Sequence, residues 1–175
     1  MFTNRTRLFI GTIFTLSFIL LLSVHLYEFA GVAAGMIIML IWDYFKQGTL
    51  IIAAKHFHHK DFEKANRVLS EIKKPDFLSK NRRGYYEFLM GGVCLQKQDF
   101  EEAEMHYEIA AKYPLRSVND HVAALVHVAN ISIRLGNFEK AEAYLQLTDQ
   151  HKENINAKMK DVIDRLRQEL KKNKK

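Results

Sequence analysis

The chain has 175 residues, with 2 prolines, 8 glycines, a single cysteine and a formal net charge of +6. So few prolines and glycines exclude collagen-like and low-complexity proteins, and one cysteine cannot form an internal disulfide. The mean hydropathy of −0.19 is ordinary for a globular protein. This average is misleading, because an apolar N-terminal part is followed by a charged, periodic remainder.

An apolar segment with only three potentially charged residues, His25, Glu28 and Asp43, runs from Leu8 to Phe45. As one helix it would be about 57 Å long, whereas the hydrocarbon core of a membrane is about 30 Å thick. A cleaved signal peptide is the alternative, but apolar residues resume directly after the small ones that would be cleaved. We therefore predict a membrane anchor over residues 1–45, with transmembrane helices at about 8–24 and 29–45 and a turn at His25–Glu28.

The second predicted span contains Gly31 and Gly35, at the spacing Gly-x-x-x-Gly. Small residues at this spacing let helix backbones approach closely in lipid. The contact can be made within the hairpin or with another protein, and the sequence leaves both open.

Basic residues flank both ends of the apolar segment, with Arg5 and Arg7 before it and Lys46 after it. The predicted turn has no Lys or Arg, so the positive-inside rule places both ends in the cytoplasm. We therefore predict a multi-pass integral membrane protein whose remaining domain is cytoplasmic.

A six-residue motif occurs three times after residue 46, at a spacing of 38 residues. Each copy has a variable residue, a capping residue, Phe, Glu, a second variable residue and Ala. The capping residues are Asp61, Asp99 and Asn137, which we expect to accept hydrogen bonds from backbone N–H groups of the next helix. An apolar helix precedes each cap, and these helices are predicted at Leu50–Phe57, Tyr85–Leu95 and Val122–Leu135. The pattern thus predicts three helix–turn–helix units.

These units resemble the tetratricopeptide repeat family, which is built from 34-residue helix–turn–helix repeats. The middle unit matches best, with Gly91, Phe100, Ala103 and Tyr107 at the intervals of the family. The resemblance covers about residues 46–150, and the longer spacing of 38 indicates an extra helical turn or longer connections. It implies an all-α solenoid of about three repeats over 46–153, followed by an amphipathic capping helix with a basic tail over 154–175.

The resemblance also implies a concave groove that binds a peptide or helix of a partner protein and is lined by the first helix of each repeat. The residues predicted to line it are Phe57, Tyr85, Phe88, Val126, Asn130, Ile133 and Arg134. Asn130 and Arg134 are the polar pair expected to contact a partner. Each of these side chains can instead pack on a neighbouring helix.

Catalysis and metal binding have little support in the sequence. His56 and His59 have a helical ligand spacing, but no Cys or acidic residue in the sequence nearby completes a metal site. Cys94 is interpreted as a structural thiol, because no His lies at a recognisable partnering distance in the sequence. With no phosphate-binding loop or nucleophile motif, we predict a non-enzyme without cofactor or metal.

The function predicted from these features is that of a non-catalytic adaptor or scaffold, anchored in the membrane, which binds partner proteins at the cytoplasmic surface. The alternative is a structural or assembly subunit of a membrane protein complex that docks through its transmembrane helices. No nucleic-acid partner is expected, because no basic platform interleaved with aromatic residues occurs. The basic tail is suited to contact with anionic lipid.

Overall fold

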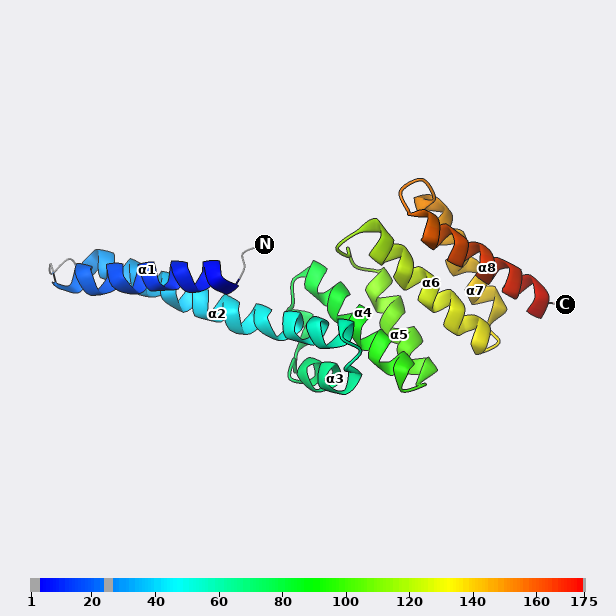
Figure 1. The fold of residues 1–175 in the computed structure, drawn as a ribbon, viewed down its shortest axis with the longest axis horizontal. Coiled ribbons are helices and arrows are strands. Elements are labelled where there is room, and N and C mark those ends of the chain that lie inside the picture. The colour runs from blue at the N-terminus through cyan, green and yellow to red at the C-terminus, as the bar shows by residue number, and fades with distance from the viewer. Residues whose placement is uncertain (1–3, 24–26, 175) are drawn as a thin grey trace. The chain divides into compact units, whose positions relative to one another are not determined.

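The computed structural model describes residues 4–23 and 27–174. The part of the chain that it describes consists of helices and the turns and loops that join them (Figure 1). The predicted all-α class is thus confirmed, while His25 and Leu26 of the predicted turn lie outside the described residues. The α-helices are α1 (Asn4–Ser23), α2 (Tyr27–His58), α3 (Phe62–Ser70), α4 (Lys80–Gln96), α5 (Phe100–Ala111), α6 (Val118–Arg134), α7 (Phe138–Leu147) and α8 (Ala157–Asn173). Two 3-10 helices, η1 (Pro75–Phe77) and η2 (Thr148–His151), lie in the connections.

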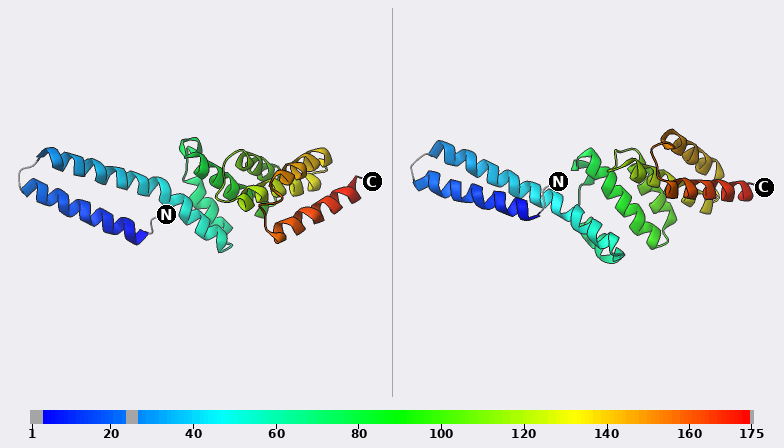
Figure 2. Two further views of the ribbon diagram at one scale, coloured as in Figure 1. Left: turned by 90° about the horizontal axis from the view of Figure 1, so that it is seen from above. Right: turned by 45° about the horizontal axis from the view of Figure 1, so that its top comes forward.

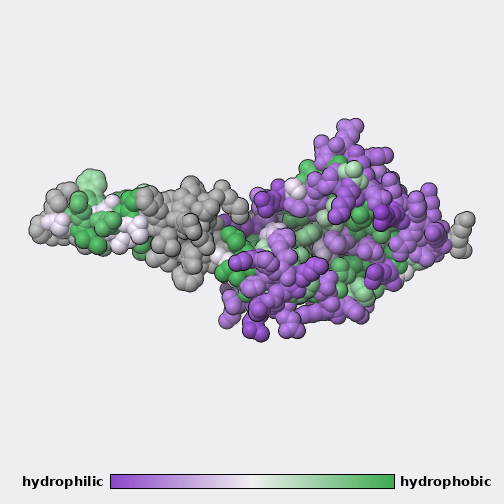
Figure 3. Space-filling model, in the orientation of Figure 1, coloured by the Kyte–Doolittle hydropathy of each residue, from purple (hydrophilic) through white to green (hydrophobic). Residues whose placement is uncertain are grey.

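The chain divides into two compact units, Met1–Thr49 and Leu50–Lys175, and the boundary falls inside α2. In the first unit, α1 runs antiparallel to the N-terminal part of α2 (Figure 2). Several large apolar side chains of this unit are exposed, among them Leu16, Leu20, Phe29 and Ile38. Figure 3 shows hydrophobic atoms on the surface of this unit, whereas the visible face of the second unit is mostly hydrophilic.

The predicted transmembrane hairpin is contradicted. Within the described residues, no helix combines the length and the apolar character that are needed to cross a membrane. The predicted second span does not end near residue 45 but continues to His58, so it is part of a longer helix. That helix carries Glu28 in its first turn and Lys55, His56 and His58 in its last. The prediction of a multi-pass integral membrane protein with a cytoplasmic domain is therefore wrong.

The turns after α2, α4 and α6 share one geometry. In each, a residue with positive φ (Lys60 at 61°, Gln98 at 64° and Gly136 at 77°) ends the first helix. The next residue is the cap, whose backbone N–H donates to the carbonyl five residues before it, over 2.8 to 3.0 Å. The side chain of each cap, Asp61, Asp99 and Asn137, accepts a hydrogen bond from the N–H three residues later, over 3.2 to 3.3 Å. The predicted capping role is confirmed at all three positions.

The alanine of each motif is a core residue. Ala65, Ala103 and Ala141 are each 0% exposed, which leaves no room for a larger side chain. Four residues later each second helix buries a large side chain, and these are Leu69, Tyr107 and Leu145. Each of the helices from α3 to α8 packs on its neighbour in sequence, so the predicted sequential packing of helix pairs is confirmed.

The first helices are longer than predicted, since α4 begins at Lys80 and α6 at Val118. The first turns of these two helices are mostly polar, so the spacing of apolar residues in the sequence does not reveal them. Ser117 caps α6 by accepting from the N–H of Asp120. At the C-terminal end, Asn156 caps α8 by accepting from the N–H of Met159 over 2.8 Å. The apolar face of α8, with Ile163, Leu166 and Leu170, is buried in the same cluster as residues of α6 and α7.

The positive φ at the helix ends yields a stability prediction. A non-glycine residue in the left-handed region is strained by about 1–2 kcal/mol, so Gln98→Gly should raise the free energy of unfolding by about 0.5–1 kcal/mol. At Gly136 an added Cβ would meet nothing within 4 Å, so Gly136→Ala should lower it by about 1 kcal/mol through backbone strain alone. Urea denaturation followed by circular dichroism measures both.

The control for these variants is Gln96→Gly, two residues earlier and inside α4. Gln96 is the last residue of α4 and has a helical backbone, so glycine there should lower the free energy of unfolding by about 0.5–1 kcal/mol. If Gln98→Gly destabilises the chain as much as Gln96→Gly does, the assigned turn geometry is wrong.

Candidate functional site

Two of the predicted groove residues, Phe57 and Tyr85, are partly buried against the core between α2, α3 and α4. The Phe57 ring packs edge-to-face on Phe62 with centroids 5.3 Å apart. It also covers Gly92 so closely that a Cβ there would lie 2.4 Å from the ring. The position of Phe57 is therefore set by packing within the chain.

Phe88 belongs to an aromatic group between α4, α5 and α6. Its ring makes edge contacts with Tyr107, at 5.5 Å, and with His127, at 6.1 Å. Tyr107 and His127 stack face to face with centroids 4.5 Å apart. Burial lowers the pKa of His127 to about 4, because an apolar environment disfavours the imidazolium ion. At neutral pH this histidine is an uncharged member of the core.

The other predicted groove residues all lie on α6 and differ in exposure. Val126 and Ile133 are 7% and 5% exposed and belong to the core with α7 and α8. Asn130 is partly buried, and Arg134 is exposed with its guanidinium group 5.5 Å from the centre of the Phe100 ring. Among the predicted groove residues, Asn130 and Arg134 are thus the polar side chains that a partner can reach, and a partner-binding groove stays a prediction.

No other described segment of this chain makes the predicted close helix contact at Gly31 and Gly35, and a contact with another protein stays a prediction. A Cβ added at either glycine would meet nothing within 4 Å, so no other described segment packs closely against these two residues.

Part of the basic C-terminal tail is paired within the chain. Arg165 and Arg167 form ion pairs of 2.6 Å with Asp161 and Asp149, and Lys174 pairs with Glu142. Contact of the tail with anionic lipid stays a prediction.

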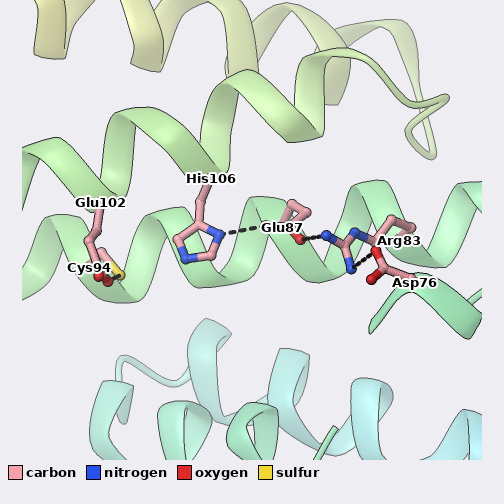
Figure 4. Close-up of polar contacts among 6 residues, drawn as sticks. All are labelled: Asp76, Arg83, Glu87, Cys94, Glu102 and His106. Carbon is pink, nitrogen blue, oxygen red and sulfur yellow. Dashed lines mark hydrogen bonds and ion pairs between the residues drawn. The ribbon is translucent and has the colours of Figure 1, made fainter. Parts of the chain in front are cut away.

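A line of polar side chains, absent from the sequence-based prediction, runs between α4 and α5 (Figure 4). Its centre is Glu87, which is 2% exposed. Glu87 Oε1 lies 2.8 Å from Arg83 Nη2, and Glu87 Oε2 lies 2.5 Å from His106 Nδ1. Arg83 also pairs with the exposed Asp76, with Nη1 3.0 Å from Oδ1. Burying an ionised carboxylate costs free energy unless it is paired and hydrogen-bonded. Arg83 and His106 supply these contacts to Glu87.

Cys94, Glu102 and His106 lie together at the end of this line (Figure 4). Each offers one ligand atom, and these atoms lie within 4.8 Å of one another. The Cys94 thiol donates a weak hydrogen bond to Glu102 Oε2 over 3.9 Å. Burial, with the nearby charges of Glu102 and Asp99, raises the pKa of the thiol.

No histidine lies at a recognisable partnering distance from Cys94 in the sequence, but in the structure a ring nitrogen of His106 lies within 4.8 Å of its thiol. The turn between α4 and α5 folds residue 106 back beside residue 94, although 12 positions separate them in the sequence. The available signal was the spacing Cys-x7-Glu-x3-His across a predicted helix–turn–helix. Because Glu102 and His106 are four residues apart, they share one face of α5.

The comparisons with known proteins give no relative. No family model, curated protein or solved structure matches this chain.

The lowered pKa of His127 predicts a loss of stability in acid. In the unfolded chain this imidazole binds a proton near pH 6.5, whereas in the folded chain its pKa is about 4. The stabilisation is therefore complete above pH 6.5 and is lost as the pH falls toward 4, by at most about 3 kcal/mol. In His127→Phe, which keeps an aromatic ring beside Tyr107, this part of the acid dependence should disappear.

The measurement is urea denaturation of the full chain between pH 4 and pH 7. The exposed His58 supplies the control, because His58→Asn should keep the wild-type pH dependence. An unchanged acid dependence in His127→Phe would show that His127 is not a buried neutral group.

Proposed function

We propose that this chain is a tetratricopeptide-like scaffold that binds a partner protein and catalyses no reaction. The observation that carries the proposal is the threefold turn, with equivalent positive-φ residues, caps and buried alanines at 38-residue spacing. Stacked helix pairs of this kind expose a continuous surface along their first helices, and such surfaces hold peptides or helices.

The binding surface we propose is the accessible face of α6, with Asn130 and Arg134 as its polar contacts. The two residues are four apart, so they share one side of the helix. The Phe100 ring beneath Arg134 limits the freedom of the guanidinium group, so less conformational entropy is lost on binding. An amide and a guanidinium group together suit the backbone and the carboxylates of a partner.

The groove residues that are buried have a different role in this proposal. Val126 and Ile133 are buried in the core of α6, α7 and α8. They hold the helix in place, and we do not expect them to contact the partner. Phe57, Tyr85 and Phe88 continue the surface along the first helices, each with one part of the ring packed on the core.

A photo-crosslinking amino acid in place of Asn130 tests the proposal in the full chain. The control position is Met105, which is 48% exposed on the second helix of the middle unit. We expect one defined protein to be crosslinked at position 130 and not at position 105. Equal crosslinking at the two positions would contradict a surface on α6.

Affinity for the crosslinked protein is then measured with purified components. The double variant Asn130→Ala/Arg134→Ala should weaken the Kd at least about tenfold, because hydrogen bonds to charged groups contribute about 1.5–3 kcal/mol. The matched control, Asn66→Ala/Arg67→Ala, removes the same two residue types from α3. If both double variants bind like the wild type, the assignment of this surface is wrong.

A further inference from the structure

Three side chains of the types that bind transition metals meet where α4 and α5 join. Cys94 lies in the last turn of α4, and Glu102 and His106 lie one turn apart on α5. One ligand atom of each lies within 4.8 Å of the other two. Thiolate, imidazole and carboxylate are the three ligand classes of zinc sites.

The separation of Cys94 Sγ from Glu102 Oε2 is close to that of two ligands in a tetrahedral site. Zinc bonds of about 2.3 Å to sulfur and about 2.0–2.1 Å to nitrogen or oxygen place such ligands about 3.3–3.6 Å apart. Cys94 Sγ and Glu102 Oε2 lie 3.9 Å apart, so they need to approach by only a few tenths of an ångström. Glu102 is exposed, and its flexible side chain can make most of the movement while the buried Cys94 stays in place.

His106 is held in the orientation that a metal ligand needs. Its Nδ1 lies 2.5 Å from Glu87 Oε2, and Glu87 also accepts from Arg83. Because Glu87 acts as the acceptor, the neutral imidazole carries its proton on Nδ1 and its lone pair on Nε2. Figure 4 shows this second nitrogen on the side of Cys94 and Glu102. A carboxylate behind a histidine is the usual outer partner of a metal-bound imidazole.

The ligand set occurs in the middle repeat alone when the three repeats are aligned at their spacing of 38 residues. The positions equivalent to Cys94, Glu102 and His106 hold His56, Lys64 and Val68 in the first repeat, and Ser132, Lys140 and Tyr144 in the third. The repeat fold itself thus demands neither a thiol nor an imidazole at these places. The repeat fold therefore does not explain why the middle repeat has all three ligand types, with His106 hydrogen-bonded to the buried Glu87.

We propose that Cys94, Glu102 and His106 bind one Zn²⁺ ion, and that Glu87 and Arg83 position His106 for it. A thiolate and an imidazole favour zinc over magnesium or calcium, which prefer oxygen ligands. The Cys94 thiol releases its proton to solvent as the zinc–sulfur bond forms, and water completes the coordination. The ion would join the end of α4 to the first turns of α5 and so brace the middle repeat.

The test is a metal titration of the purified, untagged full chain after removal of bound metal. Cobalt(II) is the first probe, because a cobalt–thiolate bond gives a charge-transfer absorption that reports the cysteine directly. We expect saturation at one equivalent, loss of the absorption in Cys94→Ser, and displacement of cobalt by zinc. Competition with a chromophoric chelator then gives the zinc Kd.

The remaining variants separate ligands from positioning residues. Glu102→Gln changes an exposed side chain and should weaken the zinc Kd at least about tenfold, as should His106→Gln, while Glu87→Gln should weaken it by about 10- to 100-fold. The control is His56→Gln/His59→Gln, which removes the other histidine pair and should leave the Kd unchanged. Circular dichroism confirms that each variant keeps its helical content.

Two results would overturn the proposal. The first is a folded wild-type chain that shows no thiolate absorption with stoichiometric cobalt, which would leave the cluster as a thiol–carboxylate hydrogen bond. The second is metal binding that survives Cys94→Ser and Glu102→Gln but is lost in the control.

Discussion

The reversal of the chain at Lys60, Gln98 and Gly136 is the constraint on which the repeat unit depends. A single left-handed residue ends the first helix, and the cap that follows begins the second. Because the chain turns within so few residues, the two helices must lie in contact. The alanine four residues after each cap permits that contact, and the large side chain one turn later fills the space beside it. The cores between successive pairs follow from this one geometry.

The same turn brings functional groups together that are distant in the sequence. Cys94 lies in the last turn of α4 and Glu102 in the first turn of α5, so the reversal alone brings them close together. In the third repeat the equivalent Ser132 and Lys140 are both joined to Glu104 of α5, which links the second and third repeats. One backbone geometry therefore supports a candidate metal site in one repeat and a polar link in another, according to the side chains it presents.

The sequence predicts those features that depend on local chemistry. The caps at Asp61, Asp99 and Asn137 and the order of the helix pairs follow from the motif, because capping and helical periodicity act over a few residues. The contact of Glu87 with His106 does not follow from the motif, since these two residues meet only after α4 and α5 pack. The predicted second span at 29–45 ends too early, because α2 continues from an apolar part into the core of the first repeat. Val126 and Ile133 show a related limit: helical spacing identifies an apolar face but not whether another helix covers it.

Hydrogen exchange at the three turns tests the equivalence of the repeats most directly. The backbone N–H groups of Asp61, Asp99 and Asn137 each donate to a carbonyl five residues earlier. All three should therefore exchange at least about a hundredfold more slowly than in an unfolded chain. Exchange at the unfolded rate at any one of these amides, in an otherwise folded chain, would contradict three equivalent repeats.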